Sequence, residues 1–241
     1  MKAIIFAAGL GTRIQEISKG KPKALLTVNG EILLEKAINF LSENGVTELI
    51  VNIHHQSNLM KDFILNSNFP IPVSISDESD LLLDTGGGLL KARSFFNDGK
   101  DFIVFNVDII SNIDLQEMFK IHQKSNALAT LAVRKRQTSR YLLFNDNLKM
   151  IGWENINTKE QILHHREENY QQFAFSGIHI LSPQIFDLLE EEKKKAFSIT
   201  KSYIDLSKNH KIQAYIHNQD YWFDVGKPES YKEACEFLKH I

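Results

Sequence analysis

The first half of the chain alternates between short apolar runs and segments with helical spacing of apolar residues, and this order strongly limits the possible folds. Apolar, β-branched runs at Lys2–Ala7, Thr47–Ile53 and Phe102–Asn106 are typical of buried strands. Between the first two, Glu31–Asn44 carries apolar residues at helical spacing and is followed by Gly45, a common helix stop. We therefore expect an α/β fold with a doubly wound, mainly parallel sheet that binds ligands at the carboxyl ends of its strands.

The pattern changes after about residue 125, where strand-like runs follow one another closely and favour antiparallel pairing. These runs are Ala127–Arg134, Tyr141–Phe144, Met150–Trp153 and Phe173–Leu181. The other expected elements are helices at Leu59–Leu65, Gly87–Phe96, Pro183–Leu189, Ser198–Ser207 and Glu229–Lys239, and strands at Val73–Ser76 and Ile212–Ile216. Few apolar residues occur in Glu154–Gln172, which is expected to form a loop or hairpin over the site. No repeat or flexible linker divides the chain, so we expect one domain over residues 1–241 with a small antiparallel substrate-binding lobe.

A loop of small residues, Ala8–Thr12, follows the first strand directly, so its backbone N–H groups can surround an anionic group without interference from side chains. Arg13 and Lys23 add positive charge beside it. A P-loop is excluded because Gly20-Lys21 is followed by Pro22 instead of Ser or Thr. A dinucleotide fingerprint is excluded because Ile14 occupies its third glycine position. The pattern indicates a nucleotide phosphate site of another kind.

Composition excludes several classes of partner. The chain has 28 basic and 30 acidic residues and a net charge of −2, which argues against nucleic acid and anionic membranes as partners. The single cysteine, Cys235, rules out an intramolecular disulfide and a cysteine metal cluster. The first apolar run is too short for a signal peptide, and no run approaches the roughly 20 apolar residues of a membrane span. We expect a cytoplasmic location.

Acidic and glycine-rich positions suggest where chemistry takes place. Asp108 closely follows an apolar strand, where a carboxylate suits Mg²⁺, although a turn or helix-cap role is the structural alternative. Gly86-Gly87-Gly88 lets a planar base approach the backbone, and a flexible loop before a helix is the alternative. His54 and His55 follow a strand and point to opposite faces, so one of them is expected to hydrogen-bond in the site and a metal pair is not expected.

Six short blocks combine small, acidic and aromatic residues in a specific order. They are Ala7-Ala8-Gly9-Leu10-Gly11-Thr12-Arg13, Lys21-Pro22-Lys23, Asp84-Thr85-Gly86-Gly87-Gly88, Phe105-Asn106-Val107-Asp108, Phe175-Ser176-Gly177-Ile178 and Trp222-Phe223-Asp224-Val225-Gly226. Together they resemble the signature of the sugar-phosphate nucleotidylyltransferases, also called NDP-sugar pyrophosphorylases, over almost the whole chain. Within that family, the Thr-Gly-Gly-Gly block and the short C-terminus are most similar to N-acetylmuramate-1-phosphate uridylyltransferase-like members.

The resemblance implies a Rossmann-like, glycosyltransferase-A-like sheet with a nucleotide-binding half at residues 1–125 and a sugar-binding half at 126–241. It implies transfer of a nucleotidyl group from an NTP, with UTP favoured, to a sugar 1-phosphate. The residues that it assigns are catalytic Arg13 and Lys23, nucleotide-binding Ala8, Gly9, Gly11, Thr12, Thr85, Gly86 and Gly87, sugar-binding Ser176 and Gly177, and the Mg²⁺ ligands Asp108 and Asp224.

The implied reaction needs positioning and charge neutralisation around an in-line attack on the α-phosphorus, because the sugar phosphate is already anionic and requires no general base. Arg13 and the Gly9–Thr12 amides would hold the leaving pyrophosphate, and Lys23 would bridge the two reacting phosphates. Two departures from the family stand out. Val107 replaces a common glycine, and the lysine that often holds the sugar phosphate has no clear counterpart.

Three rival functions follow from the same residues. One is a mannose- or heptose-1-phosphate guanylyltransferase, and another is a catalytically silent nucleotide-sugar sensor, which would not need two metal-binding carboxylates. A Rossmann oxidoreductase is disfavoured by Ile14. The expected partners are an NTP and a sugar 1-phosphate, in a monomer or small homo-oligomer. The chain ends soon after Asp224, so the β-helix extension of bifunctional relatives, and with it acetyltransferase activity, is not expected.

Overall fold

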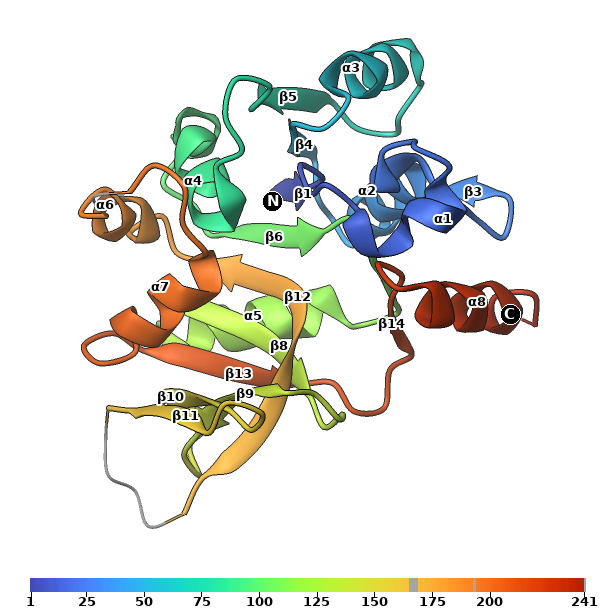
Figure 1. Ribbon diagram of the computed structural model, residues 1–241. Helices are drawn as coiled ribbons and strands as arrows, with labels where there is room; N and C mark the ends of the chain where they lie inside the picture. The colour runs from blue at the N-terminus through green and yellow to red at the C-terminus, as the bar shows by residue number, and fades with distance from the viewer. Residues whose placement is uncertain (165–168, 193, 241) are drawn as a thin grey trace.

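The parallel half of the central sheet follows the order β6-β1-β4-β5 in the computed structural model, which describes residues 1–164, 169–192 and 194–240 (Figure 1). Its strands are β1 (Lys2–Phe6), β4 (Glu48–Ile53), β5 (Val73–Asp77) and β6 (Phe102–Asn106). All of these pairs are parallel. The strands read as nearly continuous apolar runs because both faces of the sheet are covered.

Successive side chains of β1 point to opposite faces of the sheet, and each face has its own apolar layer. Ile4 and Phe6 face one hydrophobic cluster, whereas Ala3 and Ile5 face the other. Helices α2 (Leu33–Glu43), α3 (Ser57–Asn66) and α5 (Leu115–Ser125) pack against the second face, and α4 (Asp84–Lys91), α6 (Ile185–Leu189) and α7 (Ile199–Leu206) pack against the first. The predicted doubly wound α/β architecture is therefore confirmed.

The second half of the chain adds antiparallel strands to the same sheet. The long strand β12 (Gln171–Leu181) pairs antiparallel with β6, with β8 (Ala129–Arg134) and with β9 (Arg140–Phe144), so it links the parallel half to the lobe (Figure 1). The lobe continues through β10 (Met150–Asn155) and β11 (Glu160–Leu163), while β13 (Ile212–Ile216) pairs parallel with β8. The stretch Glu154–Gln172 thus contains the end of β10, the turn and β11 of a hairpin, and its residues 165–168 lie outside the described part.

Several elements differ from the sequence-based expectation. The helix expected at Gly87–Phe96 starts earlier and ends earlier, because α4 runs from Asp84 to Lys91. Gly86-Gly87-Gly88 lies inside its first turns, so the alternative of a flexible loop before the helix is wrong. A 3-10 helix follows at Arg93–Phe96. The amphipathic helix α5 was not predicted, although Asp114 caps it by accepting a hydrogen bond from the Glu117 backbone N–H at 2.8 Å.

Two short strands bring the end of the chain back to the middle of the sheet. Strand β14 (Trp222–Asp224) pairs antiparallel with β7 (Ile109–Ser111), and Asp224 stands opposite Ile109. Helix α8 (Pro228–Phe237) follows, and its Ala234 packs in a third cluster with Ile14. The remaining elements are α1 (Gln15–Ser18), β2 (Thr27–Val28), β3 (Glu31–Ile32) and the 3-10 helices Thr12–Ile14 and Lys23–Leu25. In the part of the chain that the structure describes, no helix is long and apolar enough to cross a membrane.

Candidate active site

A cavity of about 350 Å³ opens at the carboxyl ends of the parallel strands. It is lined by Phe6, Ala8, Gly9, Lys23, Asn52, Leu82, Asp84, Thr85, Asn106 and Asp108. The predicted residues Ala8, Gly9, Lys23, Thr85 and Asp108 are among them. The location agrees with the rule that open α/β sheets bind ligands beyond the carboxyl ends of their strands.

The glycine loop after β1 leaves its backbone open to the cavity mouth. Gly9 has no other atom within 4 Å of the position that a Cβ would occupy. Gly11 has a φ of +63°, a left-handed conformation that glycine adopts without strain, and it turns the chain into the 3-10 helix Thr12–Ile14. Ile14 is fully buried and anchors this turn, whereas Thr12 and Arg13 are exposed. The same isoleucine that breaks the dinucleotide fingerprint therefore has a packing role.

A buried polar network, which the sequence-based prediction missed, holds this loop. The Asn52 Oδ1 atom accepts hydrogen bonds from the backbone N–H groups of Ala7 and Ala8, at 2.7 Å and 3.3 Å. The Asn52 Nδ2 atom donates to Glu78 Oε1 at 2.8 Å. The visible signal in the sequence is a polar residue inside the apolar run Leu-Ile-Val-Asn-Ile.

Glu78 connects the network to helix α4. Its side chain is 0% exposed, and its Oε2 atom accepts a hydrogen bond from the Leu83 backbone N–H at 3.3 Å. Burial raises the pKa of Glu78, although the hydrogen bonds to its oxygens oppose this shift. The carbonyl oxygen of Glu78 lies 2.7 Å from His54 Nδ1, so His54 makes a backbone contact at the edge of the site, while His55 is exposed. One network therefore joins the phosphate loop, β4 and the start of α4.

The three glycines of α4 allow close packing. A Cβ on Gly86 would overlap the Phe197 ring, and one on Gly87 would overlap the backbone carbonyl of Lys195. A Cβ on Gly88 would lie 2.6 Å from Glu78 Oε1. Gly86 and Gly87 thus face the chain before α7 and Gly88 faces the buried polar network, whereas the cavity is lined by Asp84 and Thr85. The base contacts assigned to Gly86 and Gly87 stay predictions.

Two carboxylates from distant parts of the chain converge beside Gly226. A Cβ on Gly226 would lie 2.9 Å from Asp108 Oδ2, 2.9 Å from Asp224 Oδ1 and 3.5 Å from Arg13 Nη2. The pairing of β14 with β7 creates this convergence, and the Val225 backbone N–H donates to the Asp108 carbonyl at 2.9 Å. Only a glycine leaves the space between these groups open.

This donor set fits Mg²⁺, which prefers one or two carboxylates together with water and substrate phosphate oxygens. Among the described residues, no group of three or more His, Cys, Asp or Glu side chains could hold an ion, so phosphate and water would supply the other ligands. The Lys23 Nζ atom lies 2.5 Å from Asp108 Oδ2, and both side chains are mostly buried. The site therefore already stabilises positive charge next to Asp108.

The predicted sugar-binding segment lies inside the sheet, where β12 changes register against β8 between Phe175 and His179. Ser176 is fully buried, and its Oγ atom lies 2.7 Å from His217 Nε2. Gly177 has a φ of +77°, and a Cβ there would lie 2.7 Å from Asn106 Nδ2. The Ser176 hydroxyl therefore faces a histidine, and its predicted sugar contact stays untested.

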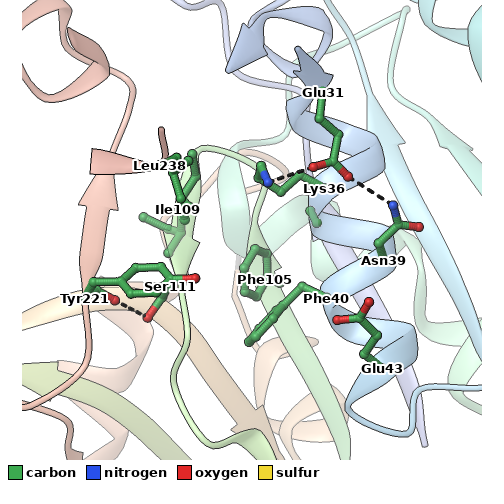
Figure 2. A pocket seen from close by; sticks show the side chains of 12 residues that line it. Glu31, Lys36, Asn39, Phe40, Glu43, Phe105, Ile109, Ser111, Tyr221 and Leu238 are labelled. Carbon is green, nitrogen blue, oxygen red and sulfur yellow. Dashed lines mark hydrogen bonds and ion pairs between the residues drawn. The ribbon is translucent and has the colours of Figure 1, made fainter. Parts of the chain in front are cut away.

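A second hollow lies away from these residues, between α2, β7 and the end of α8 (Figure 2). Its volume is about 220 Å³, and its polar rim includes Glu31, Lys36 and Asn39 (Figure 2). None of the residues predicted for the site lines it. The cavity at the carboxyl ends of the strands is therefore the candidate active site.

The chain is similar to known proteins over almost its whole length. The model of the nucleotidyl transferase family matches residues 2–240 of the chain. The chain is 30% identical over 239 residues to the probable mannose-1-phosphate guanylyltransferase 3 of Oryza sativa subsp. japonica, and the match covers 96% of this chain but 63% of the rice protein. It is 27% identical over 233 residues to the D-glycero-alpha-D-manno-heptose 1-phosphate guanylyltransferase of Campylobacter jejuni, with 96% and 97% of the two chains covered.

The fold also matches solved structures. HddC from Yersinia pseudotuberculosis, in complex with GMP-PN, superposes with a TM-score of 0.79 and 21% sequence identity. The match covers 98% of this chain and 99% of HddC. At this identity, the likeness supports a common fold and nothing finer.

Proposed function

Because the chain belongs to the nucleotidyl transferase family, we propose that it transfers a nucleotidyl group from an NTP to a sugar 1-phosphate and releases pyrophosphate. The observation that carries the proposal is the convergence of Asp108, Asp224 and Arg13 beside Gly226, next to Lys23 and the glycine loop. Both substrates are polyanions, so a site for this reaction must gather cations and metal-binding carboxylates around the α-phosphate.

The roles of the residues follow from their positions. The open backbone of the loop at Gly9–Gly11 and the exposed Arg13 side chain would bind the β- and γ-phosphates, which leave as pyrophosphate. Asp108 and Asp224 would hold Mg²⁺, which supplies Lewis-acid polarisation of the phosphoryl oxygens when bound. The sugar phosphate oxygen attacks without help from a base, because it is ionised at neutral pH. No covalent enzyme intermediate is required.

Lys23 has two possible partners during this reaction. In the structure its ammonium group pairs with Asp108 at 2.5 Å. When Asp108 holds a divalent cation, Lys23 would lose this partner and could contact the α-phosphate and the incoming sugar phosphate. The lysine would thus neutralise Asp108 until the nucleotide and its metal ion arrive.

The nucleotide is the open part of the proposal. The Thr-Gly-Gly-Gly block favours UTP by its resemblance to uridylyltransferases, and N-acetylmuramate 1-phosphate would then be the acceptor. The rice and Campylobacter relatives are named as guanylyltransferases, so GTP with a mannose- or heptose-type 1-phosphate is the second candidate.

The test is pyrophosphate release in the presence of Mg²⁺. UTP, GTP, CTP, dTTP and ATP are each combined with glucose, mannose, heptose and N-acetylmuramate 1-phosphates. Turnover above the reaction without enzyme is expected for one or a few pairs, and it should stop on chelation and resume on addition of Mg²⁺. Saturable nucleotide binding without turnover on any pair would contradict the proposal and favour the silent sensor.

A further inference from the structure

Two arginines lie over the ring of Trp222, two residues before Asp224. Arg134 is the last residue of β8, and Arg136 lies in the loop that leads to β9. Their guanidinium carbons lie 5.8 Å and 4.8 Å from the centre of the Trp222 ring. A guanidinium is attracted to the face of an aromatic ring, and its N–H groups can still bind an anion. Trp222 and Asp224 both belong to β14, so the Trp222 ring keeps two cations close to this strand.

Neither guanidinium forms a close ion pair in the described part of the chain, although the Asp220 carboxylate acts on Arg134 and the Asp224 carboxylate acts on Arg136 from farther away. Arg136 donates one hydrogen bond, from Nη2 to the Phe175 carbonyl at 3.0 Å, and its buried Nε atom has no partner. Arg134 donates to the Asp220 carbonyl at 3.3 Å. By contrast, the exposed Arg93 pairs with two carboxylates, at 2.6 Å and 2.5 Å. Partly buried charges without a close counterion are costly, and an anionic ligand would offset the cost.

Arg136 lies between the predicted sugar segment and the predicted metal site. The Phe175 carbonyl accepts its hydrogen bond, and the Trp222 Nε1–H donates to the neighbouring Ser176 carbonyl at 2.9 Å. Burial lowers the pKa of Arg136, and the nearby Asp224 carboxylate opposes this shift. The guanidinium is thus held between the predicted sugar segment and Asp224.

If the proposed transfer is correct, a second dianion must be held close to the NTP, and it needs its own cation. In the proposed function, Arg13 binds the leaving phosphates and Lys23 is shared between the two reacting phosphates, so neither cation serves the sugar phosphate alone. We propose that Arg136, supported by Arg134, binds the phosphate group of the sugar 1-phosphate. This assignment rests on the proposed function and supplies the contact for which the sequence offers no lysine.

The kinetic test replaces Arg136 by methionine, which has a similar length and can keep its contact with Trp222. The KM for the sugar 1-phosphate should rise about 10-fold or more, the range expected for losing a hydrogen-bonded ion pair, while the KM for the NTP stays within about 2-fold. Arg136→Lys should recover part of the loss. Arg140→Met is the control, because Arg140 is an exposed arginine at the start of β9.

A binding test does not depend on turnover. The chain has two tryptophans, Trp153 and Trp222, so Trp153→Phe leaves Trp222 as the only fluorescent indole. Titration with inorganic phosphate or mannose 1-phosphate should give a saturable fluorescence change that Arg136→Met removes and Arg140→Met retains.

The outcomes separate this inference from the proposed function. A fluorescence response with no turnover on any pair would support the anion site and contradict the transferase. An unchanged KM for sugar 1-phosphate in folded Arg136→Met protein would overturn the inference. A rise in KM limited to sugar phosphates that carry a carboxylate would also overturn it, because the arginines would then bind that carboxylate and not the phosphate group.

Discussion

Asn52 offers a sharp test of the buried network, because its orientation is determined by its surroundings. Its Oδ1 atom accepts from Ala7 and Ala8, so its Nδ2 atom must face Glu78 Oε1 at 2.8 Å. Asn52→Asp keeps the shape and both contacts with the loop, but it replaces the N–H donor with a carboxylate oxygen. Two buried carboxylates in contact cannot both ionise, so we expect the pair to retain one extra proton at neutral pH.

The magnitude follows from proton linkage. An unfolded aspartate has a pKa of about 3.9, so holding its proton at pH 7 costs about 4 kcal/mol, and at pH 5 about 1.5 kcal/mol. The folded variant binds a proton that the unfolded chain releases, so the variant loses stability relative to the wild type as the pH rises. The free energy of unfolding of the variant should fall below that of the wild type by about 1.4 kcal/mol more for each pH unit between pH 5 and pH 7.

The assay is urea denaturation of both proteins at pH 5, 6 and 7. Asn39→Asp is a matched control, because Asn39 Nδ2 also donates to a glutamate, Glu31, at 3.0 Å (Figure 2). That pair is partly exposed, and Lys36 Nζ lies 2.7 Å from Glu31 Oε2, so a nearby positive charge offsets the added carboxylate. The free energy of unfolding of the control should therefore fall by less than about 1 kcal/mol at pH 7. The reasoning would be refuted if Asn52→Asp lost the same free energy of unfolding at pH 5 and pH 7. It would also be refuted if this loss were no larger than that of Asn39→Asp.

Three further predictions concern other parts of the site. Arg13→Ala and Asp108→Asn should each lower turnover by roughly 10²–10³-fold with an unchanged circular dichroism spectrum, since each removes a charge directed at the reacting phosphates, and near-normal turnover would contradict these roles. Gly177→Ala should cost about 1–3 kcal/mol in urea denaturation, because φ is +77° and its Cβ would lie 2.7 Å from Asn106 Nδ2. Burial and the charge of Arg134 lower the pKa of His217 to about 4, so its neutral form is favoured in the fold. The unfolded chain then binds more protons between pH 6.5 and 4, and stability should fall by about 3 kcal/mol as the pH drops through this range, a slope that His217→Asn should reduce.

The local sequence pattern alone determined the parallel core and the position of the glycine loop. The apolar runs of β1 and β6 are buried on both faces, so their hydrophobic residues are continuous in the sequence, and the parallel α/β core could be recognised from them. The glycine loop also carries its own signal, because small residues directly after a strand leave few alternatives to a phosphate site or a tight turn. The family and the doubly wound fold were both predicted and are confirmed.

Elements with weak local signals were harder to predict. The short strands β7 and β14 are stable only because they pair with each other, and nothing in Trp222–Asp224 alone predicts a strand. The first turns of α4 contain three glycines, which normally disfavour a helix, and packing against Phe197 and Lys195 overrides that preference.

Tertiary structure decided which distant groups meet. Asp108 and Asp224 are separated by more than a hundred residues, yet the β14–β7 pairing brings an oxygen of each to 2.9 Å from the position that a Cβ on Gly226 would occupy. Asn52 and Arg136 likewise acquire their environments from other elements, through Glu78 and through Trp222. Helix and strand preferences act over a few neighbouring residues, whereas these contacts depend on how the buried apolar faces stack, and that is a property of the whole fold.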